Sequence, residues 1–359
     1  MKILDRYIFR QFAKAFIFTS TTFVFLFILI TMVEHLDDMM GRNLSIFQII
    51  GYYLLSIPST VLVTAPVSSL LASILVAGRL SASSELSAIR SAGVSMRQLL
   101  YPFLAGASFI AAVNLVNSCW IAPAAFSGIA RFEREHLSKE PGKLPENRNM
   151  HLIEQGNRIV SIGSMGSDES TGKAVSIEEF SGAHLVSRID AASMSYNPKS
   201  GEWMLENAAI RSFTGGSEQY SFIGRKPVKL SISPRSLLEF NLQPDEMNVS
   251  RHYRYLTEKR QAGISGLDRS AVKFYTKLSL PFASLIVMLI GVPLSAKKKR
   301  GGLASEITIA LFFGFLFIGL QKTVAIAGYQ GAMNPALAAW LPNIIFLIVG
   351  YLIYKTAID

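Results

Sequence analysis

The chain has 359 residues, of which 50% are hydrophobic and only 17% are charged, against about 25% charged in a typical soluble domain. This composition excludes an ordinary soluble globule and favours a membrane protein. The net charge of +10 does not indicate nucleic-acid binding, because much of the positive charge flanks apolar segments on one side. A single cysteine, Cys119, excludes an internal disulfide.

Apolar runs of roughly 20 residues, enough to cross a hydrocarbon core of about 30 Å, lie on both sides of a long polar middle region. Three spans precede this region and three follow it, so the predicted fold is a polytopic α-helical membrane protein with a 3+3 layout. The predicted domains are helices 1–3 in 1–124, an inserted domain in 125–265 and helices 4–6 in 266–359. The predicted spans are about 8–33, 52–77, 99–122, 271–294, 307–327 and 337–354.

Lys and Arg collect in the short flanks on one side of these spans. That side holds the N-terminus, the turn between the second and third spans, the run Lys297–Arg300, and Lys355 near the C-terminus. The positive-inside rule makes this side cytoplasmic. We therefore expect both termini inside and the middle region outside.

The inserted domain is expected to be all-β. Stretches such as 157–162 and 202–207 alternate polar and apolar residues, which is typical of half-buried strands, and Gly-rich or Asn-Pro turns separate them. Short strands at even spacing favour a sandwich or a partly open barrel.

The sequence contains no convincing catalytic or cofactor-binding motif. The nearest approach to a phosphate-binding loop, 166–174, has the wrong spacing and lacks the final hydroxyl. The histidines show no paired spacing for a metal, and no G-x-S-x-G elbow occurs. Asp37 and Asp38 would point about 100° apart on a helix, which is typical of a solvated loop. We expect no catalytic residue, no metal site and no nucleotide bound by this chain.

The most informative segment is the polar turn between the second and third spans, about 83–93. Ser83 or Ser84 can cap a short helix with Glu85 in its first turn, and Ser95 to Gln98 then fits a capping box that opens the third span. From the residues alone, Glu85 has two interpretations. It either complements the helix dipole, worth about 0.3–1 kcal/mol, or offers a carboxylate to a cytoplasmic partner.

This turn resembles the coupling-helix signature of the LptF/LptG family of lipopolysaccharide-export permeases. The similar stretches are Arg79-Leu-Ser-Ala-Ser-Ser-Glu-Leu86 and Ala92-Gly-Val-Ser95. The start of the chain, Leu4-Asp-Arg-Tyr-Ile8, is similar to that of the family, more so of LptG. Trp120-Ile-Ala-Pro123 matches the end of the family's third span. The layout and length agree, so the resemblance covers essentially the whole chain.

The resemblance implies a permease subunit of an ABC transporter that extracts lipopolysaccharide from the bacterial inner membrane and passes it to a periplasmic bridge for outer-membrane assembly. It also implies a jellyroll-like periplasmic domain, a second homologous (LptF-like) permease, an LptC/LptA-like bridge protein, and a cytoplasmic ABC ATPase dimer that binds ATP and magnesium. Glu85 occupies the family's coupling-glutamate position. The residues expected to contact the ATPase are Glu85, Leu86, Ile89 and Arg90.

Lipid recognition is where the sequence departs from the family. Well-known LptG proteins carry basic residues near the outer end of the first span, whereas the stretch 31–38 here is acidic. Either the partner permease supplies the cations, or the lipid A carries a different charge. Lys322 in the fifth span is a candidate substitute, although it could also snorkel to the surface. The apolar lining of the lipid cavity is expected from Phe25, Ile28, Leu62 and Phe317.

Two alternatives stay open. The first is another ABC-type permease for lipid or lipoprotein, but such proteins commonly carry the outer domain after the first span, whereas here it follows the third. The second is a membrane scaffold without transport activity, whose outer domain is a docking module. A scaffold would have no ATPase partner.

Overall fold

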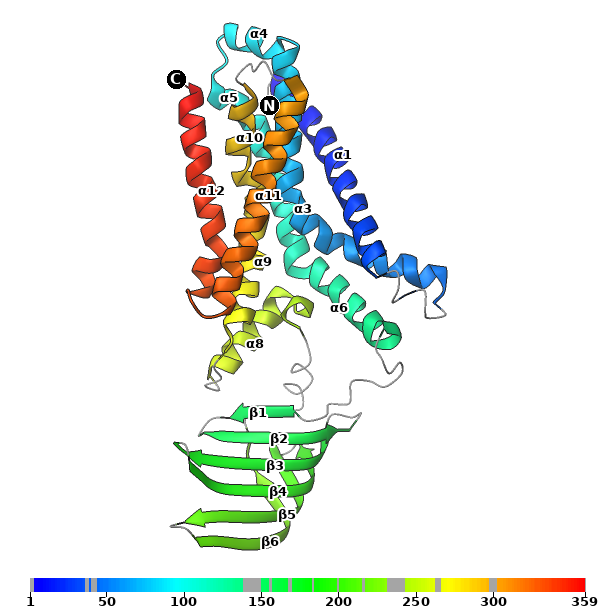
Figure 1. Ribbon diagram of the computed structural model, residues 1–359, viewed down its shortest axis with the longest axis vertical. Helices are drawn as coiled ribbons and strands as arrows, with labels where there is room; N and C mark the ends of the chain where they lie inside the picture. Colours follow the sequence, from blue (N-terminus) through cyan, green and yellow to red (C-terminus); the bar gives the residue numbers. More distant parts are fainter. Residues whose placement is uncertain are drawn as a thin grey trace. The chain divides into compact units, whose positions relative to one another are not determined.

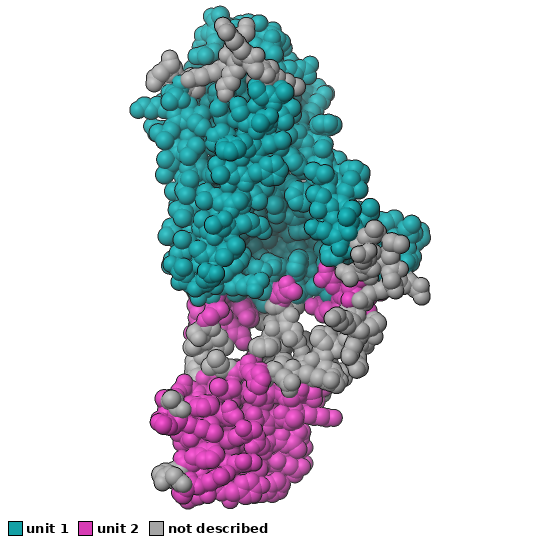
Figure 2. Space-filling model, viewed as in Figure 1, with its two compact units in different colours: residues 1–132, 244–252, 268–359 teal, residues 133–243, 253–267 magenta. Residues whose placement is uncertain are grey.

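The computed structural model divides into two compact units (Figure 2). The helical unit contains residues 1–132, 244–252 and 268–359, and the β unit contains 133–243 and 253–267. The predictions for Asp37, Asp38 and the run Lys297–Arg300 lie outside the described residues. The structure describes residues 3–35, 39, 44–137, 150–154, 157–166, 170–182, 184–198, 200–214, 217–230, 243–261, 266–296 and 302–358.

In this part of the chain, six helical segments are long and apolar enough to cross a membrane, which confirms the predicted number and order of spans. The third and fourth segments are interrupted, the third by a π-helical turn and the fourth by a break at Val287. The segments are α1 (Ile3–Glu34), α3 (Ile46–Ala82), α5 (Met96–Val116) with η1 (Asn117–Ile121) and α6 (Ala122–Phe132), α9 (Asp268–Ile286) with α10 (Met288–Ala296), α11 (Gly302–Tyr329), and α12 (Pro335–Ile358).

Within the helical unit, α3 is the central helix and α1 lies at its side (Figure 1). In the most apolar stretch of each helix, 72% of the residues of α3 are buried but only 6% of those of α1. The large apolar side chains of α1, such as Phe18 and Phe25, are therefore exposed. A contiguous apolar face of this kind is suited to lipid or to another apolar protein surface.

The β unit is a six-stranded antiparallel sheet in the order β1-β2-β3-β4-β5-β6 (Figure 1). Apolar side chains of one face, among them Val160, Ile177 and Leu205, form its core around the fully buried Trp203. The prediction of an inserted all-β domain is confirmed, and the described strands follow one another as a meander. They are β1 (Met150–Glu154), β2 (Arg158–Met165), β3 (Thr171–Ser181), β4 (His184–Asn197), β5 (Glu202–Thr214) and β6 (Ser217–Val228).

The described residues at the junctions of the two units are largely helical. On the way out, α6 belongs to the helical unit and η2 (Glu133–Leu137) to the β unit, so the boundary predicted at residue 125 falls inside α6. On the way back, η3 (Pro244–Glu246) belongs to the helical unit, and α8 (Val249–Gln261) begins in the helical unit and ends in the β unit. The amphipathic sequence of α6 explains the difference, because its buried alanines continue the packing of the third span.

Candidate functional site

A short helix, α4 (Glu85–Ser91), occupies the turn between α3 and α5. Ser84 precedes α4 with a left-handed backbone, φ 61°, and Gly93 follows it with φ 87°. The predicted capping box of α5 is present. The Ser95 hydroxyl accepts from the Gln98 backbone N–H at 3.3 Å, and the Gln98 side chain accepts from the Ser95 N–H at 3.0 Å. These local signals place α4 across the turn, as the sequence predicts.

The carboxylate of Glu85 is held by two side chains, one from α1 and one from the turn that follows α3. The Tyr7 hydroxyl of α1 donates to Oε2 at 3.1 Å. The Ser83 hydroxyl lies 3.0 Å from Oε1 and 2.9 Å from the carbonyl oxygen of Arg79, and it shares its single proton between them. Ser84 takes the N-cap position without a side-chain bond. Glu85 is half-buried, so an oriented carboxylate keeps one side open to a cationic group of another protein.

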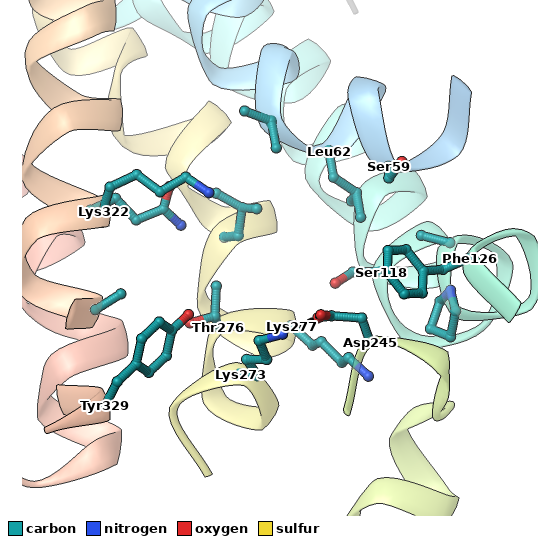
Figure 3. A pocket seen from close by; sticks show the side chains of 16 residues that line it. Ser59, Leu62, Ser118, Phe126, Asp245, Lys273, Thr276, Lys277, Lys322 and Tyr329 are labelled. Carbon is teal, nitrogen blue, oxygen red and sulfur yellow. Dashed lines mark hydrogen bonds and ion pairs between the residues drawn. The ribbon is translucent and has the colours of Figure 1, made fainter. Parts of the chain in front are cut away.

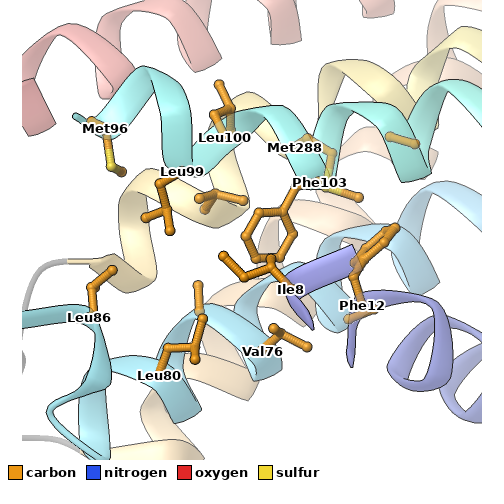
Figure 4. Close-up of a cluster of buried hydrophobic side chains, with 14 of the residues drawn as sticks. Ile8, Phe12, Val76, Leu80, Leu86, Met96, Leu99, Leu100, Phe103 and Met288 are labelled. Atoms are coloured by element: carbon orange, nitrogen blue, oxygen red, sulfur yellow. The ribbon is translucent and has the colours of Figure 1, made fainter. Parts of the chain in front are cut away.

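Leu86 fixes α4 to the helical unit. Its side chain is only 3% exposed and packs in a cluster contributed by α1, α3, α5 and α10 (Figure 4). Full burial of a leucine stabilises a contact by about 1.5–3 kcal/mol. Ile89 is half-buried and Arg90 is exposed. Other members of this cluster include Ile8, Leu80, Met96, Leu99, Phe103 and Met288.

A cavity of about 330 Å³ lies in the helical unit (Figure 3). Its walls come from α3, η1, α6, α9 and α11, and they combine apolar side chains such as Leu62 and Phe126 with three lysines: Lys273, Lys277 and Lys322. The π-helical turn η1 contributes Ser118 to the wall. Single π-turns inside α-helices occur frequently at functional sites.

Two of the three lysines are engaged by the segment that follows the β unit. Lys273 pairs with Asp245. The ammonium group of Lys277 donates to the carbonyl oxygen of Pro244 at 2.8 Å and also to that of Met247. Lys322 is exposed and makes no hydrogen bond or ion pair with any other described residue. Of these three ammonium groups, that of Lys322 is therefore the one left for a ligand.

Behind Lys277 lies a fully buried histidine, His252. Its Nδ1 is 3.3 Å from the Lys277 ammonium and its Nε2 is 2.9 Å from the Ser270 hydroxyl, while Phe274 packs edge-on against the ring. Burial first, and then the charge of Lys277, lower the pKa of His252 from 6.5 to about 4. Because an ammonium can only donate, neutral Nδ1 accepts from Lys277 and Nε2–H donates to Ser270.

A comparison with known families decides the identity of the fold. The family described as "Lipopolysaccharide export system permease LptF/LptG" matches residues 6–356. The chain belongs to this LptF/LptG family. Similar relatives include LptG of Escherichia coli K12, 23% identical over 97% of this chain and 96% of the relative, and LptG of Haemophilus influenzae, 21% identical over 96% of both. LptF of Escherichia coli K12 is 22% identical over 96% of this chain and 92% of the relative.

In this LptF/LptG-family chain, the residues predicted for the lipid cavity separate into two groups. Leu62 and Lys322 line the cavity. Phe25 is 63% exposed and Ile28 half-buried on α1, and neither lines it. Phe317 does not line this cavity either. It is 1% exposed and packs edge-on against Phe346 of α12, because α11 turns this face toward the core.

Lys273, Lys277 and His252 were missed by the sequence predictions. A usable signal existed for the lysines, since both lie within the apolar fourth helix and an ionisable residue in a span is costly. No such signal marked His252, whose partners Ser270 and Lys277 are 18 and 25 positions away.

Proposed function

We propose that this chain is a permease subunit of a lipopolysaccharide exporter in the bacterial inner membrane and that α4 is where a separate cytoplasmic ATPase dimer drives it. The observation that carries the proposal is the oriented carboxylate of Glu85. Glu85 lies on the short helix α4, Tyr7 of α1 holds its carboxylate, and the chain belongs to the LptF/LptG family. ATP and magnesium belong to the ATPase in this proposal, and this chain binds neither.

The mechanism is mechanical coupling. A basic group of the ATPase pairs with Glu85, and a charge-assisted hydrogen bond of this kind is roughly twice as strong as a neutral one. Closure of the ATPase dimer on ATP displaces α4. Because Leu86 is buried among side chains of α1, α3, α5 and α10, this displacement moves the ends of those helices with it.

The lipid would occupy the cavity lined by Leu62 and Lys322. Its volume of about 330 Å³ is at the low end of the range of about 300–1,000 Å³ found for small-ligand pockets. One chain therefore offers room for only part of a lipid with several acyl chains. The rest of the cavity would come from a second, homologous permease, for which the apolar face of α1 around Phe25 is available. Lys322 would contact a phosphate of the lipid.

The proposed orientation places α4 and both chain ends in the cytoplasm. The two ends lie at the same end of the helical unit as α4 (Figure 1), and Arg79, Arg90 and Arg97 add positive charge there. The β unit would then be periplasmic. Its strand β6 is at one edge of the described sheet and exposes Tyr220 and Phe222, which suits strand pairing with a periplasmic bridge protein.

The test is co-purification of the full chain from its own membranes in three forms: wild type, Glu85→Gln and Glu218→Gln. Glu218 is an exposed carboxylate of β6 and serves as the matched control. Loss of one partner of a buried charge pair costs about 2–5 kcal/mol, so we expect about tenfold or more loss of bound ATPase with Glu85→Gln. Wild type and Glu218→Gln should retain the ATPase and a second six-span chain.

Thermal unfolding in detergent checks that Glu85→Gln remains folded. If Glu85→Gln keeps the ATPase at the wild-type level, the coupling role of Glu85 is rejected. If no form brings down an ATPase or a second permease, the scaffold interpretation replaces the transport proposal.

A further inference from the structure

A second hollow, of about 650 Å³, lies between α1 and α3 at the end of the helical unit that carries α4. Tyr7, Arg10 and Lys14 line it from α1, at spacings of three and four residues that place them on one face of that helix. Arg79 lines it from α3. Two helices thus bring three cations to one groove.

These cations have no partner in the described part of the chain. Arg10, Lys14 and Arg79 are all exposed, and none of their side chains forms an ion pair or hydrogen bond with another described residue. Like charges at one site repel each other, so an anion between them is favoured. The positive-inside rule explains basic residues at this end of the spans, but it does not require them to converge on a hollow.

Apart from Gln11, the rest of the lining is apolar. Phe18 is one turn beyond Lys14 on α1, and Leu75 is one turn before Arg79 on α3. Both lie toward the middle of their membrane-spanning helices. A free phosphate or an acidic protein segment would leave this apolar part uncovered. A phospholipid offers both a phosphate and an acyl chain, and anionic lipids are attracted to basic groups at the cytoplasmic surface.

We propose that this groove is a binding site for an anionic phospholipid of the cytoplasmic leaflet. Its headgroup phosphate lies among Arg10, Lys14 and Arg79, and an acyl chain runs along Phe18 and Leu75. The site is distinct from the cavity lined by Lys322, with which it shares no residue.

The groove is connected to α4 through Tyr7, which lines it and also donates to Glu85. A lipid phosphate beside Tyr7 can compete for its hydroxyl proton and thereby change how the Glu85 carboxylate is held. Regulation of ATPase coupling by the lipid, and its assignment to the cytoplasmic leaflet, rest on the proposed function, whereas binding of an anionic phospholipid itself does not.

The test measures retention of phosphatidylglycerol by the purified full chain, using native mass spectrometry after titration with the lipid. The double variant Arg10→Gln/Lys14→Gln is compared with Arg6→Gln/Arg97→Gln. The second variant removes the same charge from exposed positions of α1 and α5 outside the groove. We expect weaker binding by about fivefold per cation, or about thirtyfold in all, for the groove variant. The control variant should stay within about twofold of wild type, because exposed charges away from the site are screened.

Three further measurements complete the test. The charge-preserving swap Arg10→Lys/Lys14→Arg should retain phosphatidylglycerol. Binding of phosphatidylcholine with the same acyl chains should be equal in wild type and in the groove variant. Inorganic phosphate should not displace the lipid.

If both double variants lose phosphatidylglycerol binding equally, the groove cations contribute only general positive charge at this end of the spans, and the proposed site is overturned. Full retention by the groove variant, or complete displacement by inorganic phosphate, would also overturn it. The swap and the single change Arg79→Gln cover the case in which the double variant unfolds. Because the readout is lipid bound to this chain, failure here leaves the ATPase proposal untouched, and the reverse also holds.

Discussion

His252 and Lys277 are 25 positions apart in the chain and share a buried contact. The contact tolerates one positive charge only, because the lysine ammonium already faces Nδ1 of the ring. Protonation of the imidazole would put two cations 3.3 Å apart in a buried contact, and the nearby charges of Asp245 and Lys273 act in opposite directions. The neutral ring therefore holds the segment 244–252 against α9.

Acidification is expected to destabilise the helical unit through His252. The pKa of His252 is about 4 in the folded chain and 6.5 in the unfolded chain, so between these pH values only the unfolded chain binds the proton. Stability from this group is complete above the unfolded pKa and falls as pH drops toward the folded pKa. The loss is at most about 3–4 kcal/mol, at about 1.4 kcal/mol per pKa unit.

The measurement is the unfolding temperature of the full chain in detergent at about pH 7 and at about pH 5, in wild type and in His252→Gln. Wild type should lose more stability on acidification than His252→Gln. His184→Gln, which removes an exposed imidazole of β4, should behave as wild type does. Equal losses in wild type and His252→Gln would show that His252 is not the titrating group.

At the scale of helices, small residues determine how closely the neighbours approach α3. A Cβ atom added to Gly291 of α10 would lie 2.1 Å from the Ser73 Oγ and 2.9 Å from a methyl carbon of Leu70. Close approach of backbones at small residues is a common way for helices to pack in membranes, where apolar side chains gain little from leaving lipid. Gly319 of α11, by contrast, has no atom within 4 Å of such a Cβ.

Gly291→Ala is therefore expected to destabilise the chain by about 1–3 kcal/mol, because the added methyl group forces α10 away from α3. Gly319→Ala should be neutral or stabilising by up to about 1 kcal/mol, since alanine is the better helix former and the site is open. Unfolding temperatures in one detergent, measured side by side, check the pair. A Gly291→Ala chain as stable as Gly319→Ala would contradict the packing.

At the scale of the whole molecule, each unit has its own apolar core. The β unit is organised around Trp203, which is fully buried and packs against Tyr196. The helical unit has two clusters, one around Phe103 and one around Phe317. Units with separate cores can unfold separately, so a single unfolding temperature does not describe this chain.

Trp203→Ala should destabilise the β unit by about 3–5 kcal/mol while the helical unit keeps its unfolding temperature. Such a loss is a large part of the about 5–15 kcal/mol that stabilises a typical domain. Limited proteolysis should then cleave the β strands and leave two helical fragments intact, one from each side of the inserted domain. Phe222→Ala, which truncates an exposed ring of β6, is the control and should resist the protease as wild type does. Simultaneous loss of both units would contradict separate cores.

Periodicity and local chemistry explain why the spans, the β strands and α4 could be predicted. Hydropathy marks a span whatever its neighbours are, and the capping residues Ser95 and Gln98 act within one turn. The rotation of a helix about its axis is different, because it depends on neighbours that are distant in sequence. A helix that is apolar on all faces carries no pattern that indicates which face is buried. The sequence therefore could not show that Phe317 is a core residue and that Leu62 lines the cavity.

The held geometry of Glu85 likewise depends on a long-range contact, since Tyr7 is 78 positions away. The sequence indicated the carboxylate and its short helix but not the hydroxyl that orients it. Lys277 is a third case. Its position inside an apolar helix signalled a partner, while the identity of that partner, a pair of backbone carbonyls, left no trace in the sequence.

The two left-handed residues that bracket α4, Ser84 and Gly93, also make the turn a module for protein engineering. Because both residues lie outside α3 and α5, we expect that residues 84–93 can be exchanged with the corresponding stretch of another LptF/LptG-family protein without altering the register of either helix. Leu86 is the anchor that a grafted segment has to reproduce. Such chimaeras would let the choice of ATPase be transplanted separately from the choice of lipid.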